Sequence, residues 1–109
     1  MIAWDRVHEL RDEVGAEDFG EVVELFLEEV EEVITRLRVS PDIDKLEDDL
    51  HFLKGSALNL GFADFSALCQ DGETRSASGD GSSVDVPQIL QSYEQSKTRF
   101  MDGTKADLA

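Results

Sequence analysis

The chain has 109 residues, of which 40% are hydrophobic and 32% are charged, and its formal net charge is -15 at pH 7. This length predicts one domain over residues 1–109 with a modest core, and it leaves no room for a second catalytic domain. The negative charge argues against binding to nucleic acids and to anionic membrane surfaces, because both require clustered lysine and arginine side chains.

Two helices are predicted before residue 40. The first covers residues 4–14, where apolar residues recur at helical spacing, and Gly15 closes it. Asp18 can cap a second, longer helix, whose apolar residues follow the i, i+3, i+4, i+7 rule as far as Leu37. The opposite face of this helix is rich in glutamate, which we interpret as a solvated surface rather than as a metal site.

A third helix is predicted after the segment Ser40-Pro41-Asp42. This segment combines a capping residue with a proline suited to the first helical turn. We therefore expect the helix to run from about Asp42 to Asn59. Gly61 follows and can adopt the left-handed conformation of a helix stop.

Two further helices complete the predicted fold. The fourth begins at Phe62 and ends near residues 76–83, whose composition predicts a flexible loop. Pro87 opens the final helix, and residues 103–109 are predicted to form a frayed tail. Because we find no strand pattern and no internal repeat, the predicted fold is all-α: an antiparallel four-helix bundle with an additional short N-terminal helix.

Cysteine usage and the N-terminus both predict a cytoplasmic protein. Cys69 has no partner for an intrachain disulfide, which is typical of a reducing compartment, and we interpret it as a small buried apolar residue rather than as a redox thiol. The first residues lack the basic start and apolar run of a signal peptide. No stretch approaches the ~20 apolar residues of a membrane span.

His51 lies off the apolar stripe of the third helix. At 100° per residue from Leu46, the apolar residues at positions 50, 53, 57 and 60 fall in a stripe roughly 80° wide, whereas His51 falls at about 140°. Lys54 and Gly55 are its neighbours on the helix surface. A glycine within a helix costs roughly 0.5–1 kcal/mol relative to alanine, so Gly55 indicates a need for space, such as close approach by another molecule.

The segment from His51 to Gly61 reads His-Phe-Leu-Lys-Gly-Ser-Ala-Leu-Asn-Leu-Gly. It resembles the signature of histidine-containing phosphotransfer (HPt) domains, the helical carriers that move a phosphoryl group between receiver-domain aspartates in bacterial phosphorelays. The resemblance implies that His51 is the phosphoacceptor and that the partners are response-regulator receiver domains and a hybrid sensor kinase. It also implies that Mg²⁺ belongs to the acidic site of the receiver, and we expect no cofactor of the chain's own.

Three side chains are predicted to assist His51. Lys54 can neutralise the charge of a bound phosphoryl group. If the third and fourth helices fold back around Gly61, Glu73 is level with His51, and its carboxylate can accept a hydrogen bond from one ring nitrogen, leaving the other free to attack. Gln70, one turn nearer the hairpin, is the alternative orienting residue, since in HPt domains a polar residue on this helix often plays that part.

Phe52 and Leu58 also lie outside the apolar stripe, so we expect at least one to be partly exposed. The resemblance implies that they form an apolar rim on which a receiver domain docks, although neighbouring helices could instead cover them. Leu58 departs from the HPt pattern, which more often has a small residue there. His8 is not at ligand spacing from His51 or from any cysteine, so no metal site is predicted.

The sequence therefore predicts a phosphorelay intermediate that is not an enzyme. The sequence contains neither the Gly-x-x-x-x-Gly-Lys nor the Gly-x-Gly-x-x-Gly pattern of nucleotide-binding loops, so autophosphorylation from ATP is not expected. We expect a cytoplasmic monomer in which positioning and charge neutralisation support in-line transfer. The alternative function is a helical adaptor that docks on a receiver or kinase domain without carrying phosphate. Such an adaptor has no need of the cluster of His51, Lys54 and Gly55.

Overall fold

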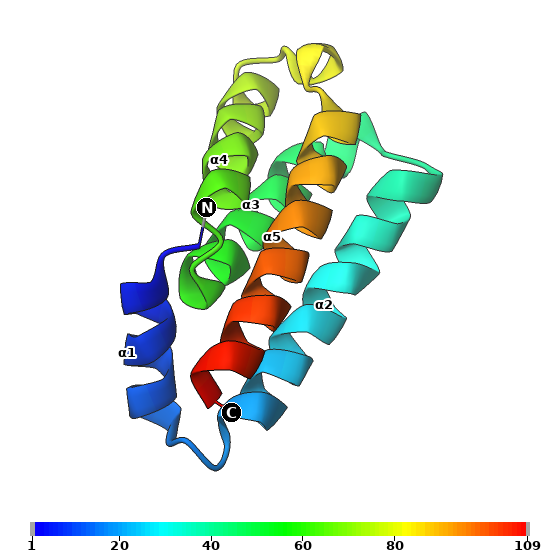
Figure 1. Cartoon of the computed structure of the whole chain (residues 1–109). Coiled ribbons are helices and arrows are strands. Elements are labelled where there is room, and N and C mark those ends of the chain that lie inside the picture. Colours follow the sequence, from blue (N-terminus) through cyan, green and yellow to red (C-terminus); the bar gives the residue numbers. More distant parts are fainter. Residues whose placement is uncertain (1, 109) are drawn as a thin grey trace.

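The computed structural model describes residues 2–108, and it describes the side chains of residues 2–104. The helices are α1 (Trp4–Val14), α2 (Phe19–Val39), α3 (Ile43–Leu60), α4 (Ala63–Ala77) and α5 (Val86–Leu108), with a short 3₁₀ turn, η1 (Gly81–Ser83), before α5 (Figure 1). The described residues contain no strand, which confirms the all-α class. No helix among them is both long and apolar enough to cross a membrane.

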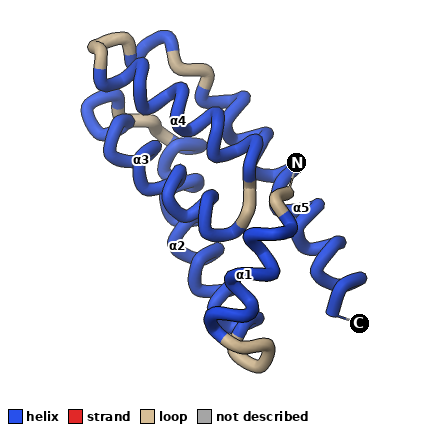
Figure 2. The backbone as a smooth tube through the Cα atoms, turned by 90° about the vertical axis from the view of Figure 1, so that its left-hand side faces the viewer, coloured by secondary structure: helices blue, strands red, loops and turns tan. Residues whose placement is uncertain are grey.

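The long helices pack around a shared core. α3 and α4 form a tight hairpin, α2 packs against α3 and α5, and α5 packs against α4. The short helix α1 contacts α2 and α3 at one end of the molecule, and Figure 2 shows it beside the lower half of α2. The resulting helical bundle is elongated, with extents of 44 × 23 × 21 Å along its principal axes.

The apolar stripe predicted for the third helix lies in the core. Leu50 and Leu53 expose no surface, and the other stripe residues of α3 are also buried. Aromatic side chains connect α4 to α5, with ring centroids 5.4 Å apart for Phe65 and Tyr93. Burial of each large apolar side chain contributes roughly 1.5–3 kcal/mol, so packing stabilises helices that would be marginal alone.

Two helix starts differ from the predicted capping. α3 begins at Ile43, because the Asp42 side chain accepts a hydrogen bond from the Asp44 backbone N–H and so occupies the capping position. Pro41 consequently lies before the helix rather than in its first turn. At the start of α2, Asp18 occupies the predicted capping position, but its side chain makes no capping hydrogen bond.

The C-terminal helix is longer than the sequence predicted. A frayed tail was expected from Gly103, whereas α5 continues to Leu108, and Ala109 lies outside the described residues. The indole of Trp4 stacks on Phe100, with ring centroids 6.3 Å apart, and covers the position that a Cβ on Gly103 would occupy. Trp4, near the N-terminus, therefore packs on α5 at the point where the helix continues beyond its predicted end.

The predicted flexible loop over residues 76–83 also contains more regular structure than expected. Its first two residues belong to the end of α4, and its last three form η1. The Ser83 hydroxyl lies 2.8 Å from both the backbone oxygen and a carboxylate oxygen of Asp80, which ties the turn together. The connection between α4 and α5 is therefore short and hydrogen-bonded.

Candidate functional site

The side chain of His51 projects from the solvent-facing side of α3, and it is 72% exposed. This exposure follows from the helical pattern, since Leu50 and Leu53 on the opposite side are fully buried and fix the rotation of the helix. The ring is therefore both accessible and held on a rigid element.

The α3–α4 hairpin brings α4 alongside His51. Gly61 ends α3 in the left-handed conformation, with φ of 77°, and the Phe62 N–H donates to the Ala57 carbonyl oxygen at 2.8 Å. A Cβ on Gly61 would lie 2.7 Å from the backbone oxygen of Ala3, so both the dihedral angle and the close packing favour glycine. This tight turn sets which α4 residues face His51.

Glu73 on α4 faces the imidazole ring. Its Oε1 and Oε2 lie 3.0 and 3.2 Å from Nδ1 of His51, and the Glu73 side chain is only 13% exposed. The ammonium group of Lys54 lies 2.9 Å from both carboxylate oxygens. Hydrogen bonds from Lys54 and then from His51 hold the pKa of the Glu73 carboxyl below its usual range.

The charge of Glu73 assigns the proton on His51. An ionised carboxylate can only accept hydrogen bonds, so the contact between Glu73 and Nδ1 requires a hydrogen on Nδ1. In the neutral ring, Nε2 then carries the lone pair. The arrangement therefore presents an accessible nucleophilic nitrogen, backed by a carboxylate that can compensate positive charge on the ring.

Gln70 lies in the same groove as His51 but forms no hydrogen bond with it. Its amide oxygen accepts a hydrogen bond from Lys54 at 3.1 Å, and its amide nitrogen donates to the Thr74 hydroxyl at 3.0 Å. Of the two residues considered for orienting the ring, Glu73 is the one in contact with it. Lys54 is thus held by two α4 side chains beside His51.

Gly55 leaves open space next to His51. A Cβ at this position would meet no atom within 4 Å, so packing within residues 2–104 gives no reason for glycine. The residue lies within α3 and has an ordinary helical backbone. The space that Gly55 leaves is therefore available to an approaching molecule.

The two predicted rim residues are exposed to different extents. Phe52 is 38% exposed and Leu58 is 58% exposed, so neighbouring helices cover neither completely. Leu58 lies two turns beyond His51 on nearly the same face of α3, whereas Phe52 points roughly 100° away around the helix. Leu58 therefore lies on the same surface as His51, and Phe52 lies at its edge.

A groove of about 560 Å³ runs between α3 and α4 beside His51 and Glu73. Its wall on α3 includes Glu47 and Asp48, which sequence reasoning did not select. Helical spacing alone could have placed them there, because residues three and four positions before a histidine in a helix lie next to it. The structure therefore adds two carboxylates to the surroundings of His51.

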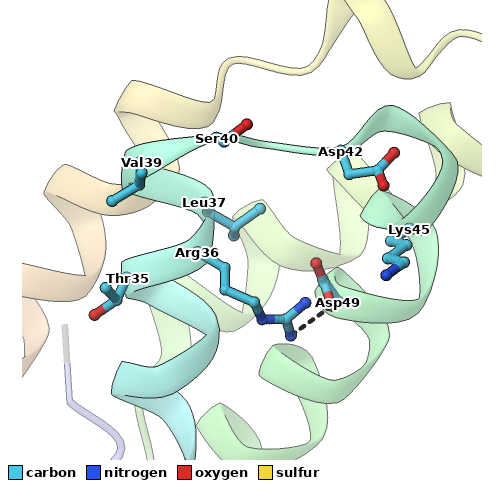
Figure 3. Close-up of a pocket in the computed structure, with 8 residues that line it drawn as sticks. All are labelled: Thr35, Arg36, Leu37, Val39, Ser40, Asp42, Lys45 and Asp49. Carbon is cyan, nitrogen blue, oxygen red and sulfur yellow. Dashed lines mark hydrogen bonds and ion pairs between the residues drawn. The ribbon is translucent and has the colours of Figure 1, made fainter.

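A second cavity of about 440 Å³ lies on another side of α3, at the α2–α3 connection (Figure 3). Arg36 reaches across it to Asp49, with an N–O distance of 3.1 Å, and Lys45 lines it from α3. None of the predicted site residues lines this cavity. It is separate from the His51 groove.

The remaining candidates for chemistry lie elsewhere. Cys69 is fully buried, and burial raises the pKa of its thiol to about 12, so the thiolate needed for redox or nucleophilic chemistry is disfavoured. This confirms its interpretation as a small core residue. His8 lies half-buried on α1, away from the α3–α4 groove.

Comparison with known families gives one result. A sequence model of the Hpt domain matches residues 21–99, which is well over half of the chain. The matched span contains α3 and α4, and with them His51, Lys54 and Glu73. Neither the comparison with curated proteins nor the comparison with solved structures gave a match.

Proposed function

The chain belongs to the Hpt domain family, and we propose that His51 accepts a phosphoryl group from an aspartate of one receiver domain and passes it to an aspartate of another. Membership of this family gives the chain a phosphotransfer role in a phosphorelay. The single observation that carries the assignment to His51 is the contact between its Nδ1 atom and Glu73 at 3.0 Å, which leaves Nε2 of an exposed ring for attack.

The transfer is an in-line displacement at phosphorus. Nε2 of His51 forms a bond to phosphorus while the bond to the aspartate oxygen breaks, and the aspartate leaves as a carboxylate. The hydrogen on Nδ1 stays on the ring, donated to Glu73. The phosphorylated ring therefore carries a positive charge next to a negative one, and the second transfer reverses these steps toward another receiver.

Lys54 and Gly55 have separate tasks in this proposal. The ammonium group of Lys54, now 2.9 Å from Glu73, can turn toward the phosphoryl oxygens, which add about 1.5–2 negative charges to the site. Gly55 leaves room for the receiver's phosphoaspartate to approach. Phe52 and Leu58 supply the apolar rim on which the receiver docks.

The partner supplies what this chain does not. We expect Mg²⁺ to come from the acidic site of the receiver, and the phosphoryl group to come from receivers and a hybrid sensor kinase rather than from ATP. We further propose a cytoplasmic monomer that does not itself act as an enzyme. Helices α2 to α5 would form the antiparallel four-helix bundle of the family, with α1 as the additional helix.

Incubation with a phosphorylated receiver domain tests this function. We expect the wild-type chain to acquire acid-labile, base-stable label, and His8→Gln to acquire it equally. The variant His51→Gln should acquire none. Label that survives His51→Gln would contradict the assignment, whereas a stable complex with the receiver and no label would favour the adaptor function.

A further inference from the structure

Two features of opposite character flank His51 along α3. Toward the C-terminal end of α3, an apolar pocket of about 380 Å³ lies beside Leu58, between α1, α3 and α4. Toward the N-terminal end, the groove between α3 and α4 is bordered by Glu47 and Asp48. Any partner that covers His51 therefore meets an apolar surface on one side and an acidic surface on the other.

The pocket beside Leu58 suits an apolar side chain. Its walls include Ala3, Ala57, Gly61 and Ala63, and Leu58 at its rim is 58% exposed. Arg6 closes one edge, but its guanidinium lies 3.1 Å from Glu13 and 3.2 Å from the amide oxygen of Asn59. The positive charge of Arg6 is thus compensated by its partners at the edge of the pocket. The other walls consist mainly of small apolar residues.

The acidic side of the surface carries uncompensated charge. Glu47 and Asp48 are both exposed, and within residues 2–104 neither forms an ion pair. Glu73 in the same groove differs, because Lys54 pairs with it. The acidic site of a receiver would be repelled by Glu47 and Asp48 unless basic side chains of the receiver lay opposite them.

Resting on the proposed phosphotransfer function, we propose that this chain selects receiver domains that place an apolar side chain in the Leu58 pocket and a lysine or arginine against Glu47 and Asp48. At 1.5 Å of rise per residue, Glu47 and Leu58 lie about 16 Å apart along α3, on either side of His51. Contacts at both ends would fix the orientation of the receiver, so that its phosphoaspartate faces Nε2.

A ratio of two rates tests the proposal. The probe is a receiver domain that is charged with acetyl phosphate and exchanges phosphoryl groups with the wild-type chain. Phosphoramidate is the second donor, because this small molecule needs no docking surface. For each variant, the second-order rate of transfer from the receiver is divided by the rate of labelling by phosphoramidate. This ratio removes any direct effect on the reactivity of His51.

Leu58→Glu tests the apolar end, and Leu25→Glu on α2 is its matched control, since Leu25 is 55% exposed. We expect the ratio to fall about tenfold for Leu58→Glu and to stay near the wild-type value for Leu25→Glu. Equal ratios for the two variants would overturn the pocket as a docking site.

Glu47→Lys combined with Asp48→Lys tests the acidic end. The control combines Glu28→Lys with Glu29→Lys on the exposed face of α2, which changes the net charge by the same amount. We expect the ratio for Glu47→Lys combined with Asp48→Lys to be about tenfold lower than for wild type. For wild type the ratio should fall between about 50 and 500 mM salt, and for this double variant it should fall less. An unchanged or higher ratio would overturn the basic partner surface.

The two donors also distinguish failure of the proposed function from failure of the receiver-selection proposal. If neither a phosphorylated receiver nor phosphoramidate labels His51 in the folded wild-type chain, the proposed function itself is wrong. If both donors label His51 but the docking variants keep the wild-type ratio, only the inference about receiver selection is wrong.

Discussion

Glu73 Oε1 lies 3.0 Å from His51 Nδ1 and 2.9 Å from the Lys54 ammonium group, so one carboxylate contacts both the histidine and the lysine of the site. Glu73 belongs to α4, whereas His51 and Lys54 belong to α3. The α3–α4 hairpin thus places the exposed ring of His51 against the ion pair formed by Lys54 and Glu73.

Removal of Glu73 should release the ring. In Glu73→Ala, Nδ1 loses its acceptor, and we expect ¹⁵N chemical shifts of His51 to change from the Nδ1–H tautomer to a mixture. Transfer from a receiver should slow roughly tenfold, equivalent to about 1.4 kcal/mol. Glu73→Gln retains an acceptor oxygen and should recover much of the tautomer preference but not the charge. Identical tautomer populations in all three proteins would exclude an orienting role for Glu73.

Replacement of Lys54 should affect transfer more than folding. We expect Lys54→Ala to slow phosphoryl transfer about tenfold, because the phosphoryl oxygens lose their nearby cation. Lys45→Ala is the control, since Lys45 is exposed on a different side of α3. Circular dichroism should show the same helix content for both variants. Equal transfer rates for the two would remove Lys54 from the mechanism.

Gly55→Ala should raise stability while lowering activity. The new methyl group meets no atom within 4 Å and the backbone is helical, so we expect a gain of roughly 0.5–1 kcal/mol in the free energy of unfolding. Transfer from a receiver should nevertheless slow, because the methyl group occupies space beside His51. Gly20→Ala on α2 also meets no atom within 4 Å and should leave transfer unchanged. A wild-type transfer rate for Gly55→Ala would show that the space has no role.

Acid should weaken the contribution of Glu73 to stability. Its pKa is lowered in the folded protein, so the ionised carboxylate stabilises the fold above the unfolded-state value of about 4.3, and this contribution is lost as the pH falls through the lower folded-state pKa. Urea unfolding at several pH values should therefore show Glu73→Gln less stable than wild type at pH 7. The difference should shrink below about pH 4. A constant difference across this range would contradict the assignment of the lowered pKa.

Local sequence patterns were sufficient for most of the helices. The bounds of α1 match the predicted residues 4–14, and the apolar stripe from Leu46 to Leu60 is buried as expected. The position of Glu73 opposite His51 also follows from the sequence, because a tight turn at Gly61 leaves little freedom in how α3 and α4 align. Periodicity and one glycine stop thus locate the main elements of the site.

Contacts between distant segments were not predictable in this way. The packing of Trp4 over Gly103 joins the two ends of the chain, and no local pattern indicates that α5 continues beyond that glycine. The partners of Lys54 depend on side-chain conformations across the hairpin, where Gln70 and Glu73 both accept from it. Helical periodicity specifies the face on which a lysine lies, but it does not specify what that lysine contacts.

The decisive measurement is which histidine nitrogen of the chain becomes bonded to phosphorus. Wild-type protein with ¹⁵N-labelled histidine is treated with phosphoramidate, and ³¹P–¹⁵N coupling identifies the nitrogen bonded to phosphorus. Because Glu73 holds the hydrogen on Nδ1, we expect phosphorus on Nε2 of His51. Phosphorus on Nδ1 of His51, or on His8, would contradict it.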